Sequence, residues 1–376
     1  MEIEWIKINK LITGKATEQE KSEIARWANV SKARQKFLKD TIDFYSREEE
    51  IDISYRDIQK AWGKVNPKIV VRRKFLRRAA SVAASLALIA FSVLSYNRFF
   101  DSKDTIPHIS PGETKARLVL ADGRDFGLDS KTRKLPKNFA IKSAVQGNKT
   151  SLVIDVKGRT NERSQEYNEI LVPRYAEYQI NLEDGTKVWL NSETKLRFPL
   201  VFGDKERTVY VSGEAYFQVA HNANKPFIVN IDDNTKVKVL GTEFNIRTYE
   251  EGNSLSTLIS GSIEFIHKGA TRIINPGENC SINNATGEIV VSEADTMRVV
   301  AWKNGEFVFR NETLESIINE LSRWYKVDVS YENEEIKQTR FYIYFDRSNG
   351  FEELIYKLNQ TGRIKYRYIN KKIVIS

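Results

Sequence analysis

The chain has 376 residues, of which 41% are hydrophobic and 29% are charged, and its net charge is +9. A single cysteine cannot form an internal disulfide bond, and the three scattered histidines lack the spacing of metal ligands. Residues 1–78 carry 19 Lys and Arg against 12 Asp and Glu, whereas the rest of the chain carries 40 against 38. The composition therefore excludes a disulfide-stapled fold and a chain that is basic throughout.

Four short helices are predicted at the start of the chain, because apolar side chains recur there every three or four residues. They cover residues 1–14, 16–30, 31–49 and 51–66, and Thr17 and Glu20 have the spacing of a capping box. We expect residues 1–67 to form a small all-α domain. This domain either buries its apolar surface in a plain four-helix bundle or keeps part of it for a partner.

A long uncharged run follows this helical region. Residues 79–97 contain no charged side chain, and as a helix they would span about 28 Å, close to the roughly 30 Å core of a bilayer. Six basic residues lie in the flank at 68–78, five of them between Arg72 and Arg78, whereas acidic residues follow Arg98. The positive-inside rule then predicts a single transmembrane helix with the N-terminus in the cytoplasm and, after a linker at 98–108, the rest of the chain exported.

The basic flank also contains a candidate export signal. Arg72 and Arg73 stand in "RRKFL", which matches the twin-arginine pattern ahead of an apolar segment. Insertion by the general secretory route would need the same basic flank. Both routes remain open.

Residues 109–295 change to a period of two, which predicts an all-β domain of the sandwich or jelly-roll type. Two alternating stretches are each broken by an Asp-Gly pair, at Asp122-Gly123 and at Asp184-Gly185, 62 residues apart. Asp-Gly between alternating strands indicates a hairpin, so we expect one structural unit to be used twice. Further short strands are predicted from residue 207 to residue 293.

The last segment, residues 300–376, alternates between strand and helix patterns. Helices are predicted at 313–325 and 350–362, each between predicted strands. This order predicts a C-terminal α+β module made of two β-α-β units.

No catalytic constellation is visible. His108, His221 and His267 are isolated from one another and from cysteine, and Cys280 falls in a predicted strand, where a buried structural thiol is expected. No phosphate-binding loop or nucleophile elbow is present, and the Asp-Gly turns account for Asp122 and Asp184. We therefore expect no enzyme, no cofactor and no metal site.

The exported part resembles a known family. Residues 178–249 contain, in order, "DGTKVWLN", "FP", "RTVYVSGEAYFQV", "KPFIV" and "VKVLGTEFN", and this series resembles the periplasmic domain of FecR-type anti-sigma factors. "ITGKATEQEKSEIARW" resembles the short helical anti-sigma region of that family, although this match is the weakest. Residues 301–331 resemble its C-terminal module, which is related to short domains of secretins and TonB-dependent receptors.

The resemblance implies a single-pass inner-membrane signal transducer. The cytoplasmic helices would bind an extracytoplasmic-function (ECF) sigma factor, with Leu11, Ile24, Trp27 and Leu38 as candidate contacts. The C-terminal module would bind the signalling domain of an outer-membrane TonB-dependent transporter, and membrane proteases would free the sigma factor. Nucleic acid would not be bound directly.

Two other functions compete with this one. A membrane-anchored periplasmic glycan-binding protein would use the β domain but would leave the helices without a task. A membrane-bound DNA-binding regulator would use the helices on promoter DNA, although their basic and acidic residues alternate and no basic recognition helix stands out.

The resemblance also implies a candidate self-cleavage site. Some members of the family cleave themselves between a Gly and a Thr, and Gly241-Thr242 matches that pair. The Thr hydroxyl would attack the preceding carbonyl, and Gly would let the backbone strain without a clash. Alternatively, Gly241 forms a bulge and Thr242 is an ordinary strand residue.

Overall fold

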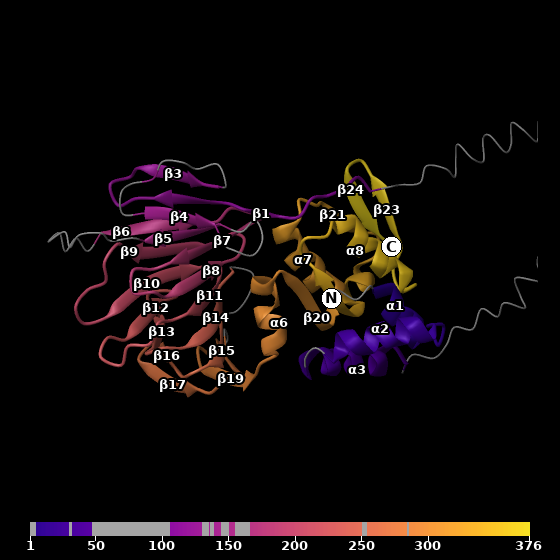
Figure 1. Ribbon diagram of the computed structural model, residues 1–376, viewed down its shortest axis with the longest axis horizontal. Coiled ribbons are helices and arrows are strands. Elements are labelled where there is room, and N and C mark those ends of the chain that lie inside the picture. Colours follow the sequence, from indigo (N-terminus) through magenta and orange to yellow (C-terminus); the bar gives the residue numbers. More distant parts are fainter. Residues whose placement is uncertain are drawn as a thin grey trace, which may run out of the picture. The chain divides into compact units, whose positions relative to one another are not determined.

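The computed structural model describes residues 5–29, 32–46, 106–129, 135, 139–143, 150–154, 166–249, 254–283 and 286–376. These fall into two compact units (Figure 1). One holds residues 1–107 with 367–370, and the other holds residues 108–366 with 371–376. The chain is mostly β-sheet with a small helical N-terminal part.

Three N-terminal helices are described: α1 (Trp5–Ile12), α2 (Glu18–Ala28) and α3 (Lys32–Ser46). The capping box is confirmed, because the Thr17 hydroxyl accepts the Glu20 N–H while the Glu20 carboxylate accepts the Thr17 N–H. Lys10 on α1 donates to the same carboxylate at 2.5 Å and, together with the Thr17 N–H, lowers the pKa of Glu20 to about 2. The predicted helix at 51–66 lies outside the described residues.

The core of this helical part forms around Trp27. Its ring meets Phe37 of α3 edge to face, with centroids 6.4 Å apart, and both side chains are fully buried. Ile8 of α1 and Ile24 of α2 are also buried. The predicted apolar spacing thus packs three helices against one another.

The expected fold class was wrong in its transmembrane helix. Among the described residues, no helix is long and apolar enough to cross a membrane. The segment on which that expectation rested, residues 79–97, lies outside the described residues, as does the basic flank at 68–78.

The β structure is built from two large sheets. The ten-stranded sheet has the order β19-β18-β15-β14-β11-β8-β7-β5-β4, and β1 pairs with β7 off this path. Its strands are β1 (Glu113–Thr114), β4 (Phe139–Ser143), β5 (Thr150–Ile154), β7 (Ala176–Asn181), β8 (Lys187–Leu190), β11 (Glu214–Gln218), β14 (Glu243–Arg247), β15 (Leu255–Ser260), β18 (Glu278–Ile282) and β19 (Ile289–Glu293).

The nine-stranded sheet has the order β17-β16-β13-β12-β10-β9-β6-β2-β3. Its strands are β2 (Ala116–Val119), β3 (Asp125–Leu128), β6 (Tyr167–Leu171), β9 (Lys195–Pro199), β10 (Arg207–Ser212), β12 (Phe227–Asn230), β13 (Thr235–Val239), β16 (Ile263–His267) and β17 (Ala270–Ile274).

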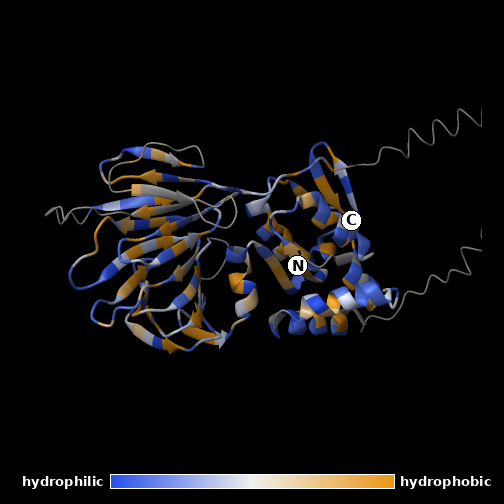
Figure 2. Cartoon of the chain, viewed as in Figure 1, coloured by the Kyte–Doolittle hydropathy of each residue, from blue (hydrophilic) through white to orange (hydrophobic). Residues whose placement is uncertain are grey.

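One apolar core joins the two sheets into a sandwich, and the strands alternate in hydropathy as expected (Figure 2). Phe217 of β11 contacts Phe227 of β12 across the core, with ring centroids 6.2 Å apart. Cys280 is fully buried in this core, and burial raises the pKa of its thiol to about 12. A structural rather than a reactive thiol was predicted, and its burial confirms this.

Both Asp-Gly hairpins form as predicted, one in each sheet. Gly123 and Gly185 take φ angles of +85° and +87°, and the preceding Asp accepts an N–H from the residue two positions on. The same turn therefore connects β2 to β3 and β7 to β8. In the second hairpin Asp184 gains a further partner.

That partner is Arg207, which is only 2% exposed. Its guanidinium pairs with the Asp184 carboxylate at 2.8 Å and donates to the carbonyl oxygens of Ala220, Lys225 and Leu240. A buried charge is tolerated when it is paired and fully hydrogen-bonded. Arg207 thus holds together three loops at one end of the sandwich.

The C-terminal module starts with α6 (Thr296–Ala301) and the 3₁₀ turn η1 (Trp302–Asn304). Its other elements are β20 (Glu306–Thr313), α7 (Leu314–Trp324), β21 (Val329–Tyr331), η2 (Glu334–Gln338), β22 (Arg340–Asp346), α8 (Phe351–Gln360), β23 (Tyr366–Ile369) and β24 (Lys372–Ile375). The expected β-α-β units were wrong, because the strands on either side of each helix lie in different sheets. β20 pairs with β22 in an antiparallel sheet, whereas β21 pairs with β24 in parallel.

Replacing Arg207 by Met should lower the free energy of unfolding by about 3–5 kcal/mol, because Asp184 and three carbonyls lose a buried partner. Urea unfolding followed by circular dichroism measures this change. Arg197→Met is the matched control: Arg197 pairs with Glu169 at the surface, so its loss should cost less than about 1 kcal/mol. Equal losses in the two variants would contradict the role given to Arg207.

Candidate functional site at the sandwich and C-terminal module junction

A row of polar side chains crosses the outer face of the ten-stranded sheet. On β11 the inward positions are taken by Ala215 and Phe217, so Glu214 and Tyr216 point outward. Glu214 is nevertheless only 4% exposed, because residues of the C-terminal module cover this part of the sheet. It lies directly opposite Arg247 of the neighbouring strand β14.

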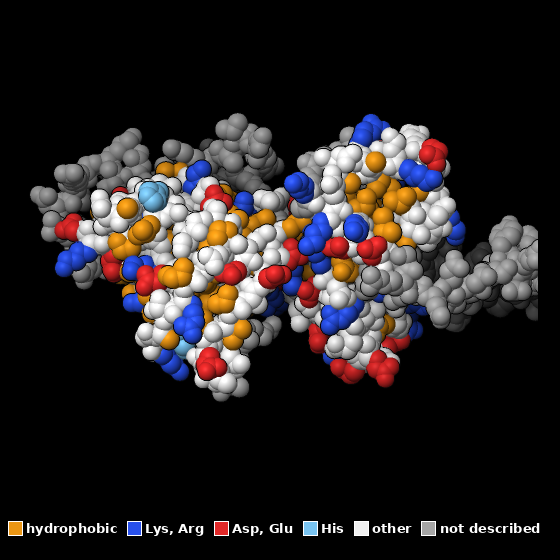
Figure 3. All heavy atoms as spheres, turned by 90° about the horizontal axis from the view of Figure 1, so that it is seen from below, with side chains coloured by type: hydrophobic (Ala, Val, Ile, Leu, Met, Phe, Trp, Pro, Cys, Tyr) orange, Lys and Arg blue, Asp and Glu red, His pale blue; other side chains and the backbone are white. Residues whose placement is uncertain are grey.

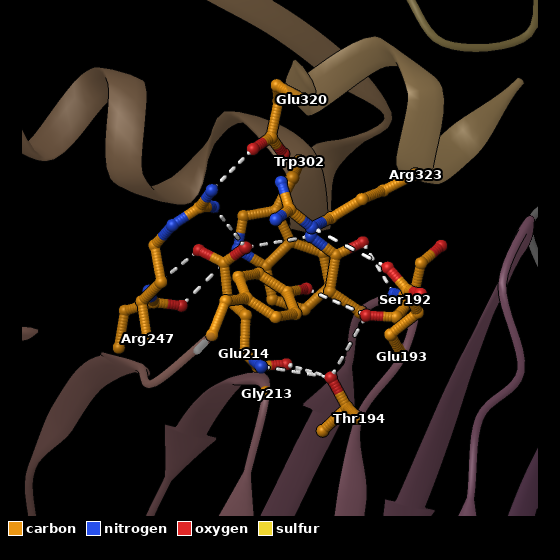
Figure 4. A network of polar contacts seen from close by, with 12 residues as sticks. Ser192, Glu193, Thr194, Gly213, Glu214, Arg247, Trp302, Glu320 and Arg323 are labelled. Atoms are coloured by element: carbon orange, nitrogen blue, oxygen red, sulfur yellow. Dashed lines mark hydrogen bonds and ion pairs between the residues drawn. The ribbon is translucent and has the colours of Figure 1, made fainter. Parts of the chain in front are cut away.

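Glu214 is the centre of this junction (Figure 4). Its carboxylate accepts hydrogen bonds from Asn191 at 2.8 Å, Asn245 at 3.1 Å and Arg247 at 2.9 Å. Its backbone N–H donates to the Thr194 hydroxyl, and that hydroxyl donates back to the Glu214 carbonyl. Three sandwich side chains are therefore oriented by one buried carboxylate.

Each of these three side chains also bonds to the C-terminal module. Arg247 donates to Glu320 of α7 at 2.7 Å. The Asn245 side-chain oxygen accepts the indole N–H of Trp302 at 3.3 Å. The Asn191 side-chain oxygen accepts a guanidinium N–H of Arg347 at 3.2 Å.

The pair of Arg247 and Glu320 is strongly charged. Burial alone would raise the pKa of Glu320, but the charges of Arg247, Arg323 and Arg347 outweigh it and lower that pKa. Burial alone would likewise lower the pKa of Arg247, but Glu320 and Glu214 raise it. Both groups are therefore charged at neutral pH.

Arginine side chains and aromatic rings surround this pair. The Arg323 guanidinium lies over the Tyr249 ring at 4.3 Å, and Arg247 lies over the same ring at 4.8 Å. The Tyr249 hydroxyl donates to the Ser192 carbonyl, and burial raises its pKa well above the usual value. Arg347 lies over the Trp324 ring at 3.9 Å.

The chemistry of the junction is that of a docking surface. Carboxylates, amides and guanidinium groups bond to one another across it. In the part of the chain that the structure describes, no group of three or more His, Cys, Asp or Glu side chains could hold a metal ion. The arrangement can hold the C-terminal module on the sandwich.

The four candidate sigma-binding residues lie in the helical part, but they are not equally accessible. Ile24 and Trp27 are buried at 1% and 0% exposure, whereas Leu11 and Leu38 are half-buried. The first two stabilise the helices, and the last two keep part of their apolar surface exposed. Arg72 and Arg73 lie outside the described residues.

Gly241 and Thr242 lie between β13 and β14. Thr242 is 4% exposed, and its hydroxyl donates to the Ser262 carbonyl at 3.0 Å. A side chain at Gly241 would come within 2.6 Å of His221, so only Gly fits. Close packing thus accounts for this glycine, and self-cleavage stays a prediction.

The junction was not predicted from the sequence. Glu214 lies on β11, Asn245 and Arg247 lie on β14, and Asn191 directly follows β8. Only the pairing of these three strands brings the four residues together. One local signal was present: "GEAYF" places a carboxylate in an otherwise apolar strand, and β11 is buried on both faces. A half-buried strand would alternate.

Glu320→Gln should loosen this junction by about 2 kcal/mol at pH 7, because Arg247 loses a charged partner. The reporter is hydrogen exchange of the Tyr175 N–H, which donates to the Arg323 carbonyl across the junction. The folded pKa of Glu320 is lowered, so its stabilisation is complete above the unfolded value of 4.5 and is lost as pH falls through the folded pKa. The difference between wild type and variant should therefore shrink as the pH falls below 4.5.

Glu312→Gln is the matched control for this measurement, because Glu312 pairs with Arg298 near the surface. It should change exchange by less than about 1 kcal/mol at every pH. A Glu320→Gln effect that is absent, or that does not depend on pH, would contradict the role of this ion pair.

Comparisons with known proteins place the chain in a family. The FecR protein family model matches residues 168–264, and the model of the FecR C-terminal domain matches residues 306–375. Two crystal structures of a protein from Parabacteroides distasonis ATCC 8503 assigned as an anti-sigma factor, at 1.65 Å and 2.50 Å, are similar to it. No curated protein matches.

The sequence likeness to the Parabacteroides protein is extensive. The first structure is 31% identical to this chain, with 98% of the crystallised chain and 55% of this chain covered and a TM-score of 0.49. The second is 30% identical, with 98% of the crystallised chain and 56% of this chain covered and the same TM-score. From the family models and these identities, the chain belongs to the FecR-type anti-sigma factor family.

Proposed function

We propose that this protein is a signal transducer that holds an ECF sigma factor through its N-terminal helices. Family membership supports an anti-sigma role. The observation that carries the proposal is the division of the molecule into a small helical unit and a larger sandwich with its C-terminal module. The helical unit is suited to hold the sigma factor, and the sandwich with its C-terminal module is suited to sense a signal.

The sigma-binding surface is proposed to lie on α1 and α3. Leu11 on α1 and Leu38 on α3 are apolar and half-buried, and Ile42 follows Leu38 by one helical turn. α3 also exposes Lys36 and Lys39. Apolar contact with a basic rim is the chemistry that an acidic, amphipathic partner surface would complement.

Capture from a lysate of the organism that encodes this chain tests the proposal, with the full chain as bait and mass spectrometry to identify what binds. One sigma factor should be recovered. Leu38→Asp should reduce its recovery at least about tenfold, because a charge would replace an apolar contact.

Ser22→Ala, at an exposed position of α2, is the matched control and should retain the sigma factor. Hydrogen exchange around Trp27 must stay slow in both variants, so that loss of binding is separated from unfolding. Recovery of promoter DNA, with a steep dependence on salt, would favour the DNA-binding alternative. Recovery of neither would remove the anti-sigma proposal.

The C-terminal module is proposed to bind the signalling domain of an outer-membrane TonB-dependent transporter. β22 pairs with β20 along one edge, and within the described residues its other edge has no partner strand. Strand addition at such an edge is a common way to bind an extended segment. The same bait should then recover one such transporter from a solubilised envelope fraction, and recovery of glycan alone would favour the glycan-binding alternative.

Three further expectations stay predictions. They are release of the sigma factor by membrane proteases, self-cleavage at Gly241-Thr242, and a location at the inner membrane. The Gly-Thr pair is simple to test, because a purified full chain that remains one polypeptide under native conditions would rule self-cleavage out.

A further inference from the structure

A short segment ties the sandwich to the C-terminal module. It comprises residues 108–114, "HISPGET", and we name it the strap. It is the path by which the chain enters the sandwich from its N-terminal side. Its contacts begin on α8 and end on β7.

The first half of the strap is anchored on the N-terminus of α8. The Glu352 carboxylate accepts the Ile109 N–H at 3.0 Å and contacts the His108 ring nitrogen at 2.5 Å. The Phe351 N–H donates to the Ile109 carbonyl at 3.3 Å. Burial alone would raise the pKa of Glu352, but the Ile109 N–H and His108 lower it, so the anchor is charged at neutral pH.

The middle of the strap lies against the junction. A side chain at Gly112 would come within 2.5 Å of the Trp324 ring, so the backbone of the strap rests on that indole. The Arg347 guanidinium lies 3.9 Å from the centroid of the same indole ring. The indole N–H donates to the Arg347 carbonyl. Arg347 in turn bonds to Asn191 of the sandwich.

The last residues of the strap join the ten-stranded sheet. β1 runs parallel to the start of β7, and the Glu113 N–H donates to the Tyr175 carbonyl at 2.9 Å. The Tyr175 N–H donates to the Arg323 carbonyl of α7, also at 2.9 Å. Tyr175 has a φ of 63°, unusual for a residue other than Gly, and its two backbone groups contact the strap and the module at once.

We propose that the strap and the junction open as one cooperative unit, so that a partner that lifts the C-terminal module from the sandwich also detaches residues 113–114 of the strap from β7. Trp324 and Tyr175 each contact both structures, so neither can be displaced from one without disturbing the other. Detaching the strap from β7 alters the connection between the N-terminal part of the chain and the sandwich. This coupling rests on the proposed function only for the identity of the partner.

Hydrogen exchange of the full chain, read by mass spectrometry, tests the coupling. The informative peptides cover the strap and residues 174–178. The substitution Glu320→Gln acts on the junction. In the described structure Glu320 bonds to Arg247 and has no bond to the strap. The substitution should accelerate exchange of the strap about thirtyfold, together with residues 174–178.

Gly112→Val acts from the opposite side, by forcing the strap away from Trp324. It should accelerate exchange at residues 174–178 and at the end of α7, as well as in the strap. Gly127→Val is the matched control, because a side chain at Gly127 would meet open space and the backbone there is not left-handed. It should leave both peptides unchanged.

The proposal is overturned if Glu320→Gln opens residues 174–178 while the strap keeps its protection, or if Gly112→Val affects the strap alone. If Glu320→Gln accelerates exchange in neither region, the proposal stands when Gly112→Val accelerates exchange both in the strap and at residues 174–178. It falls when Gly112→Val accelerates exchange in the strap alone. Because no partner is present, failure of this coupling leaves the sigma-factor proposal intact, and failure to capture a sigma factor leaves the coupling intact.

Discussion

A buried carboxylate on the outside of a β-sheet is the constraint on which the docking of the C-terminal module on the sandwich depends. Glu214 cannot reach water, so its charge must be matched by Asn191, Asn245 and Arg247. Those three side chains then present fixed donors and acceptors to the C-terminal module. The energetic need to satisfy one charge thus produces a specific surface on which the module docks.

The surface of the sandwich offers less apolar area for association with a partner than its core does. On the face drawn in Figure 3, hydrophobic side chains occur in small groups between charged and polar ones. Singly exposed apolar residues such as Val201 and Tyr210 are ordinary for a folded protein. At the junction, by contrast, directional hydrogen bonds and charge pairs link the sandwich to the C-terminal module.

Features encoded by neighbouring residues could be predicted from the sequence. The Thr17–Glu20 capping box and the two Asp-Gly hairpins depend on residues a few positions apart, and the structure confirms them. The pairing of β20 with β22 could not be predicted, because a strand-helix-strand order does not determine which strands share a sheet. The Glu214 network was missed for the same reason, since strand pairing assembles it.

We propose the helical unit as the effector and the sandwich with its C-terminal module as the sensor. The most direct measurement is in vitro transcription by RNA polymerase carrying the captured sigma factor, titrated with the full chain. The account predicts that transcription from the sigma-dependent promoter falls as the chain is added, while transcription by the housekeeping enzyme is unchanged. Undiminished transcription in the presence of excess chain would contradict it.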